Sequence, residues 1–151
     1  MIDAQKAKYV AAVSPAAIID NASATATAID CKGSRYAEII VIQGATDIAI
    51  TALKLQECET SGGTYADITG ATFNAGLDTD GTALALPSAT DDNQIAVFQV
   101  NLDKRMRFIK VVATFGDGTV GGFIAAVARL SELSKVPDVS TDLANGGVCR
   151  V

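Results

Sequence analysis

Apolar and polar residues alternate along most of this chain, and no other feature of the sequence restricts its fold as much. Every second residue is apolar in residues 96–102 and again in residues 109–115. Successive side chains of a β-strand point to opposite faces of a sheet, so this period of two predicts strands with one buried face. Strands that recur roughly every 8–12 residues, with Gly, Asp and Asn between them, predict an all-β fold, an antiparallel β-sandwich of jelly-roll type.

Three further strands are expected around these two. Residues 36–43 contain the continuous apolar run Ile39-Ile40-Val41-Ile42, which predicts a strand covered on both sides. Residues 120–130 predict a last strand of small apolar residues. In residues 48–57 the apolar side chains change from one face to the other near Thr51, which predicts a bulge there. A helix over residues 123–133 is the alternative for the last strand, because Ala-rich sequence tolerates a helix.

Two less regular regions carry weaker signals. Ala alternates with Ser or Thr in residues 22–28, which predicts an extended segment whose small side chains would allow close packing between subunits. The Gly-rich stretch of residues 60–93 is too long for a plain connection, so short strands are expected at residues 66–68 and 83–86.

A chain of 151 residues has the size of one domain. We assign residues 9–130 to the sandwich and residues 1–8 and 131–151 to extended N- and C-terminal arms, because both ends are too poor in apolar residues to form a core. The C-terminal arm carries spaced apolar residues that suit anchoring on a partner: Leu133, Val136, Val139, Leu143 and Val148. Packing of this arm on its own sandwich, or on a neighbouring subunit, is the alternative.

The composition argues against most catalytic and nucleic-acid functions. The chain has no His, so no Ser-His-Asp or Cys-His arrangement can form, and we predict no catalytic residues and no enzyme. The formal net charge of −5 would repel the phosphates of a nucleic acid. Cys31, Cys58 and Cys149 are odd in number and widely spaced, so they predict neither a disulfide framework nor a zinc site, and suit a reducing cytoplasm.

Two motifs look like ligand sites. Residues 116–121 form a literal GxGxxG after a predicted strand, the pattern that cradles a pyrophosphate in dinucleotide-binding folds. Only 30 residues follow it, too few for another βαβαβ half-domain, and Asp-Gly is a hairpin signal, so we predict a hairpin turn and no cofactor. Residues 78–81 begin like a calcium loop, but Gly81 comes at position 4 and Ala89 at position 12, so no metal site is expected.

No targeting or membrane segment is expected. Lys6 and Lys8 precede a weakly apolar run at residues 9–19, and Ala22-Ser23-Ala24 imitates a signal-peptidase site. The run contains Pro15 and lacks Leu and Phe, so we expect no cleaved signal. No stretch approaches the roughly 18–20 apolar residues of a membrane span, and we predict no membrane association.

The one basic cluster surrounds a polar turn at residues 103–106, where we expect two strands joined as an antiparallel hairpin. Arg105 and Arg107 lie there, with Lys104 and Lys110 beside them. Such a tip would suit an acidic surface on a partner, and a solvated, charged strand edge is the alternative. Arg105 and Arg107 are therefore candidate contact residues.

Two blocks of the sequence resemble small head proteins of tailed phages. Residues 53–71, LKLQECETSGGTYADITGA, look like the family stretch "LQES-D-gg-xYxDIxGA". Residues 107–114, RFIKVVAT, with the glycine-rich turn after them, resemble the family strand "R-Y-(I/L)-R-V-V-x-T". With their flanking strands the two blocks span residues 34–130, whereas neither arm matches a family pattern. The chain thus resembles the capsid cement (head decoration) proteins of jelly-roll type.

The resemblance implies a non-enzymatic role in the virion. Cement proteins of this kind lie on the capsid exterior, often as homotrimers near local threefold positions, and hold subunits of the major capsid protein together against internal DNA pressure. The resemblance therefore implies assembly in a host cytoplasm, no direct contact with nucleic acid and no cofactor, with capsid contacts on the arms. A phage neck or tail-tube component, or a receptor-binding β-sandwich, fits the same composition.

Overall fold

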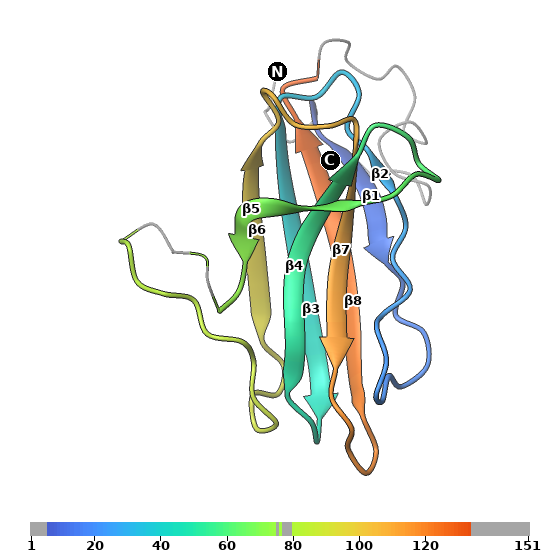
Figure 1. Cartoon of the computed structure of the whole chain (residues 1–151), viewed down its shortest axis with the longest axis vertical. Helices are drawn as coiled ribbons and strands as arrows, with labels where there is room; N and C mark the ends of the chain where they lie inside the picture. The colour runs from blue at the N-terminus through green and yellow to red at the C-terminus, as the bar shows by residue number, and fades with distance from the viewer. Residues whose placement is uncertain (1–5, 75, 77–79, 134–151) are drawn as a thin grey trace, which may run out of the picture.

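The regular secondary structure of the described part of the chain consists of β-strands joined by turns and loops. The computed structural model describes residues 6–74, 76 and 80–133. Within these residues there are eight strands and no α-helix (Figure 1). In chain order the strands are β1 (Lys8–Val13), β2 (Ile29–Asp30), β3 (Tyr36–Thr46), β4 (Ile50–Cys58), β5 (Ala66–Thr72), β6 (Ile95–Asn101), β7 (Phe108–Phe115) and β8 (Gly122–Ser131).

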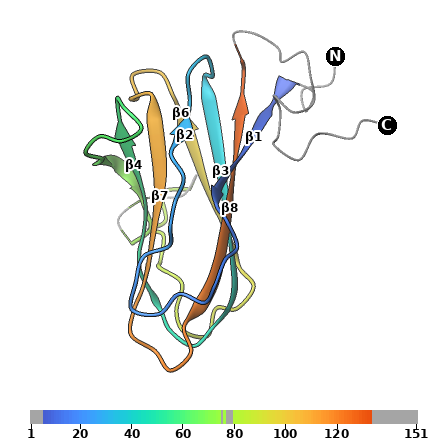
Figure 2. The same ribbon diagram turned by 90° about the vertical axis from the view of Figure 1, so that its right-hand side faces the viewer.

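These strands form two four-stranded antiparallel sheets that face each other (Figure 2). We call them sheet A, with the strand order β1-β8-β3-β6, and sheet B, with the order β2-β7-β4-β5. Every connection between consecutive strands crosses from one sheet to the other, except the one between β4 and β5. Two four-stranded sheets wound in this way form a jelly roll. The prediction of an antiparallel β-sandwich is confirmed.

The core lies between the sheets and follows directly from the alternation. On β7, the inward side chains of Ile109, Ala113 and Phe115 are at most 1% exposed. Burial of an Ile or Phe side chain stabilises a fold by about 1.5–3 kcal/mol. In sheet A, β8 contributes Ala126 and Ala128, whose small side chains let the two sheets approach closely.

The predicted bulge near Thr51 is confirmed. The pairing of β4 with β7 shifts its register between Ile50 and Ala52. Because of the extra residue, Ile50 and Leu53 both face the core although they lie three positions apart, and they are 2% and 1% exposed. The last predicted strand is confirmed as β8, so the alternative of a helix there is wrong.

Two predicted hairpins are wrong, because the strands concerned lie in different sheets. β6 belongs to sheet A and β7 to sheet B, so the turn at residues 103–106 joins the sheets rather than two paired neighbours. Residues 116–121 likewise lead from β7 in sheet B to β8 in sheet A. Turn residues mark where the chain changes direction, but they do not determine which strand the next segment pairs with.

Three shorter expectations are corrected in part. β5 is longer than the predicted residues 66–68, whereas residues 83–86 form no strand. Residues 22–28 make isolated bridges to β1 and β7 instead of a continuous strand. Ala24 is buried in that segment while its neighbours on each side are exposed, so this small side chain packs on its own sandwich.

The outward side of sheet A is apolar and open, so the prediction that β3 is covered on both sides is wrong for the described residues. Ile42 of β3, for example, is 45% exposed. We call the following outward side chains of sheet A the apolar face: Ile40, Ile42, Ile95, Val97, Phe123, Ala125 and Val127. They lie on three adjacent strands, β6, β3 and β8.

The sandwich extends slightly beyond residues 9–130 at both ends. Ala7 is fully buried, β1 begins at Lys8, and β8 continues to Ser131. Residues 1–5 and 134–151, which make up most of the two predicted arms, lie outside the described residues.

Candidate functional site

The two sequence blocks that resemble phage head proteins come together in sheet B. Residues 53–71 supply most of β4, the β4–β5 loop and most of β5, and residues 107–114 supply most of β7. Because β4 lies between β7 and β5, blocks that are far apart in the sequence form three adjacent strands (Figure 1). We call their outward polar side chains, with one from the β4–β5 loop, the motif surface: Lys54, Gln56, Tyr65, Asp67 and Lys110.

Asp67 ties β5 to β4 on the motif surface. Its carboxylate accepts hydrogen bonds from Lys54 Nζ and Gln56 Nε2, each 2.7 Å long. The bond from Lys54 first, and the bond from Gln56 second, hold the pKa of Asp67 below its ordinary value. The pairing of β4 with β5 shifts its register between Lys54 and Gln56, so one carboxylate bonds both sides of the irregularity and fixes it.

Tyr65 joins the β4–β5 loop to β7. The Nζ atom of Lys110 lies 4.4 Å from the centre of the Tyr65 ring, which is a cation–π contact. The phenol oxygen of Tyr65 donates a hydrogen bond to the backbone oxygen of Ser61 at 3.1 Å, and burial raises the pKa of the Tyr65 hydroxyl. Gln56, Tyr65 and Asp67, which carry the resemblance, are therefore residues that hold the three strands together.

The predicted contact residues Arg105 and Arg107 lie at one end of the sandwich, where both are paired within the chain. Arg107 Nε and Nη2 donate to the two carboxylate oxygens of Asp30 at 2.9 and 2.7 Å, and this pair lowers the pKa of Asp30 and raises that of Arg107. Arg105 Nη1 lies 3.3 Å from Glu57 Oε1, and the other oxygen of Glu57 accepts the backbone N–H of Met106. Both arginines thus hold the β6–β7 connection onto sheet B, with part of each side chain still exposed.

The C-terminal arm starts at the same end of the sandwich. The backbone of Arg35 bonds both Ser131, the last residue of β8, and Leu102, which follows β6. Leu133, another predicted contact residue, is partly buried against the core. The remaining predicted contact residues lie outside the described residues: Val136, Val139, Leu143 and Val148.

The backbone N–H groups of the GxGxxG loop donate hydrogen bonds to carboxylates of the chain itself. Asp47, in the β3–β4 connection, accepts hydrogen bonds of 2.7–3.0 Å from the backbone N–H groups of Thr119, Val120 and Gly121. These donors, that of Gly121 first, hold the pKa of Asp47 below its ordinary value. The N–H groups that would cradle a phosphate in a nucleotide-binding loop therefore bind Asp47 instead.

The glycines of this loop are explained by the close fit of the inter-sheet connection. Gly121 has φ +93°, a conformation that residues with a side chain rarely adopt. A Cβ atom on Gly121 would also collide with the backbone oxygen of Ile19. The loop is further fixed by Asp20, which accepts the N–H of Gly118 at 2.8 Å.

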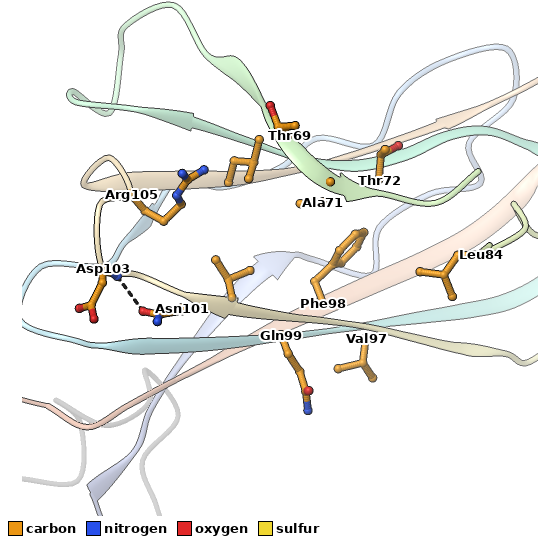
Figure 3. Close-up of a pocket in the computed structure, with 13 residues that line it drawn as sticks. Thr69, Ala71, Thr72, Leu84, Val97, Phe98, Gln99, Asn101, Asp103 and Arg105 are labelled. Carbon is orange, nitrogen blue, oxygen red and sulfur yellow. Dashed lines mark hydrogen bonds between the residues drawn. The ribbon is translucent and has the colours of Figure 1, made fainter. Parts of the chain in front are cut away.

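A groove of about 520 Å³ opens between the edge strands β5 and β6 (Figure 3). The Phe98 ring points into it and packs edge-on against Phe73, with 5.2 Å between the ring centres. Val97 and Gln99 also line the groove, although their side chains lie on the other face of β6 from Phe98 (Figure 3). At one end Asn101 Oδ1 accepts the backbone N–H of Asp103. The groove is thus lined by the edge strands of both sheets and by one largely buried aromatic ring.

The remaining titratable groups of the described residues form no cluster that could bind a metal ion, and the described thiols are buried. They include no group of three or more His, Cys, Asp or Glu side chains that could hold a metal ion. Cys31 and Cys58 are buried and free, and burial raises the pKa of the Cys31 thiol to about 12, which keeps it protonated at neutral pH. Cys149 and residues 78–79 of the calcium-like motif at residues 78–81 lie outside the described residues. No helix in the described part of the chain has the length and hydropathy to cross a membrane.

Several of these contacts give no signal in the sequence. Asp30, Asp47 and Glu57 are single carboxylates whose partners lie far along the chain, so only the fold reveals them. The apolar face did have a signal, because residues 39–42 are apolar at odd and even positions alike.

No protein-family model matches the chain, and no curated protein is significantly similar to it.

Proposed function

We propose that this protein is a non-enzymatic structural protein of a tailed-phage virion, a cement protein that binds the outer capsid surface and stabilises it against internal DNA pressure. The motif surface carries the proposal. Two blocks that resemble phage head proteins form three adjacent strands, and the residues that carry the resemblance contact one another there. The jelly roll supports the proposal because viral capsid domains use this fold, although a fold alone assigns no function.

The proposed partner is the major capsid protein, and the proposed assembly is a homotrimer at local threefold positions on the capsid exterior, reached after synthesis in the host cytoplasm. We place the capsid contact at the end of the sandwich that carries Arg105 and Arg107, because the C-terminal arm starts from the same end. The arm would bind through Val136, Val139, Leu143 and Val148. Cofactors, nucleic acid and membranes have no part in this proposal.

Co-sedimentation with capsids tests the proposal. Expanded capsids of the phage that encodes the protein, purified without it, should bind the purified chain at a fixed ratio and show added density on their exterior by electron microscopy. Removal of residues 143–151 should abolish binding while the Tm and the oligomeric state stay unchanged. A Tm that falls by many degrees while capsid binding survives would place the arm in the core and refute its role as an anchor.

The same experiment can reject the cement role altogether. Rings or stacks that form without capsids would favour a neck or tail-tube component. Failure of the folded, full-length chain to bind any capsid form, together with binding to host-surface glycans, would favour a receptor-binding sandwich.

A further inference from the structure

The outward side of sheet A concentrates the exposed apolar surface of the described residues. Nine large apolar side chains are exposed in the described part of the chain. Six of these nine lie on the outward side of sheet A: Tyr36, Ile42, Ile95, Val97, Phe123 and Val127. Each of the six exposes between 38% and 65% of its surface. Contiguous exposed apolar surface of this kind marks a site of interaction with another molecule.

Strand pairing arranges these side chains in rows that cross the sheet. Paired residues lie side by side on one face, so each row is continuous from strand to strand. One row consists of Ala11, Val127, Ile40 and Val97. The next row consists of Ala125, Ile42 and Ile95.

The first of these rows has a polar row as its other neighbour. This polar row carries opposite charges on the two central strands. It consists of Tyr9, Arg129, Glu38 and Gln99, from β1 to β6. Glu38 on β3 lies opposite Arg129 on β8 in the strand register, and Gln99 Nε2 lies 3.5 Å from Glu38 Oε1. The apolar rows are thus bordered by one acidic and one basic residue on neighbouring strands.

We propose that the apolar face binds a second copy of the chain, sheet A against sheet A, about a two-fold axis parallel to the strands and between β8 and β3. These are the two central strands of the sheet, so this axis places β3 of one copy over β8 of the other. Ile40 then faces Val127 of the partner subunit, and Glu38 faces Arg129 of the partner subunit.

The face is complementary to itself in size as well as in charge. Under the same axis Ile42 faces Ala125 of the partner subunit, so a long side chain meets a short one in the second row. At the sheet margin Val97 faces Ala11 of the partner subunit. Alternation of large and small side chains lets two sheets interdigitate at the usual separation of about 10 Å. This self-complementarity favours a second copy over an unrelated partner.

The area is sufficient for a specific contact. β3 and β6 pair over seven residues, and sheet A is four strands wide, which gives a footprint of about 19 by 23 Å. The side chains that stand on this footprint add area, so two copies would bury on the order of 600 Å² each. That value reaches the lower end of specific protein interfaces, roughly 1,200 Å² in total.

This two-fold contact would form between copies in solution, and it is independent of the homotrimer that we propose on the capsid surface. A two-fold contact through sheet A leaves the basic end of the sandwich and the motif surface uncovered. Loss of the two-fold contact without loss of capsid binding, or the reverse, would therefore identify which of the two proposals fails.

Analytical ultracentrifugation of the full-length chain tests the contact. The wild type should sediment as a concentration-dependent dimer. Ile42→Lys places a charge in the centre of the face and should weaken dimerisation by at least about tenfold. The matched control is Val120→Lys, because Val120 is 58% exposed but lies in the GxGxxG loop, and it should dimerise like the wild type. Circular dichroism checks that both variants are folded.

A charge exchange tests the axis itself. Glu38→Arg and Arg129→Glu should each weaken self-association, because like charges then face each other across the axis. An equimolar mixture of the two variants should form heterodimers of nearly wild-type affinity, since each Arg again faces a Glu of the other subunit. Heterodimers that form no better than either homodimer would overturn the proposed axis.

Three outcomes would overturn the proposal as a whole. The first is a wild-type chain that stays monomeric at about 100 µM. The second is a trimer that Ile42→Lys does not change. The third is a chain that dimerises only after removal of residues 134–151, which would mean that the C-terminal segment occupies the apolar face.

Discussion

The two outward faces of this sandwich differ in the interactions of their side chains. On sheet B, the charged and polar groups of the motif surface bond one another, as Asp67 does with Lys54 and Gln56. On sheet A, aliphatic side chains such as Ile42 and Val97 are exposed. Both faces come from strands with the same inward alternation. The inward pattern therefore builds the sandwich, whereas the outward pattern decides which face is left for a partner.

A face whose polar groups are already paired gains little from a new contact, because a partner would have to replace existing hydrogen bonds. An aliphatic face gains free energy from any surface that removes it from water. The difference between the two faces predicts that association with another molecule takes place through sheet A. It also predicts that substitutions on sheet B will change stability rather than association.

The largest expected effect comes from a comparison of two isoleucines on one strand of sheet A. Ile39 is fully buried and Ile42 is 45% exposed. Ile39→Ala should destabilise the fold by about 2–5 kcal/mol, a fall of roughly 5–20 °C in Tm. Ile42→Ala should cost about 1 kcal/mol or less in the monomer but weaken the dimer. Calorimetry at low protein concentration measures the first effect, and equal losses for both variants would show that β3 is buried on both sides.

A smaller effect is expected at the end where inter-sheet connections meet. Asp47→Ala removes the acceptor for three backbone N–H groups and should lower the Tm by several degrees at pH 7. Folding lowers the pKa of Asp47, so its stabilising contribution is complete above about pH 4 and is lost as the pH falls through the folded-state value. Asp47→Asn should therefore flatten the profile of Tm against pH below pH 4.

The control for this prediction lies in the glycine loop itself. Asp117 is exposed and makes no hydrogen bond or ion pair with any residue that the structure describes. Asp117→Asn should leave both the Tm at pH 7 and the acid profile unchanged. An equal response of Asp47→Asn and Asp117→Asn would mean that the loop is not held by Asp47.

The fold could be predicted from the sequence where one face of a strand is buried. Alternation placed Ile109 and Phe115 inside correctly, and the change of faces near Thr51 located the bulge. The pairing of strands could not be predicted in the same way. Most turns here cross between sheets, and the residues at 103–106 carry the same turn signals whether they close a hairpin or join two sheets.

The candidate site was predicted less completely than the fold. Composition identified Arg105 and Arg107 as a basic cluster but could not show that Glu57 and Asp30 pair with them, because those partners lie far away in the sequence. The motif surface was visible only as two separate blocks. Their contact depends on the strand order, which a single sequence does not determine.

Sheet B should also be the acid-sensitive face. Bonds from Lys54 and Gln56 lower the folded-state pKa of Asp67, so its stabilising contribution is present above about pH 4 and disappears on acidification. Asp67→Asn should lower the Tm by a few degrees at pH 7, and the difference from the wild type should vanish near pH 2. Glu59→Gln is the control, since Glu59 bonds no residue in the described part of the chain. A constant difference across this pH range would contradict the electrostatic origin.

The smallest effect is expected from Lys54→Met, which removes one charged partner of Asp67 and keeps the aliphatic stem. Gln56 still bonds Asp67, and the side chains of the ion pair are 29% and 55% exposed. Exposed ion pairs contribute little to the free energy of unfolding, so the Tm of Lys54→Met at low salt should be lower than that of the wild type by no more than about 2 °C. The control, Lys32→Met, should leave the Tm unchanged.

Salt then separates the two faces, because in about 1 M sodium chloride the Debye length is only ~3 Å. The Tm difference between Lys54→Met and the wild type should disappear there, whereas the dimer through sheet A should persist, since burial of aliphatic surface is not screened by salt. A Tm difference that survives in high salt would assign the role of Lys54 to packing of its methylene groups, and the contrast between an electrostatic face and an aliphatic face would no longer hold.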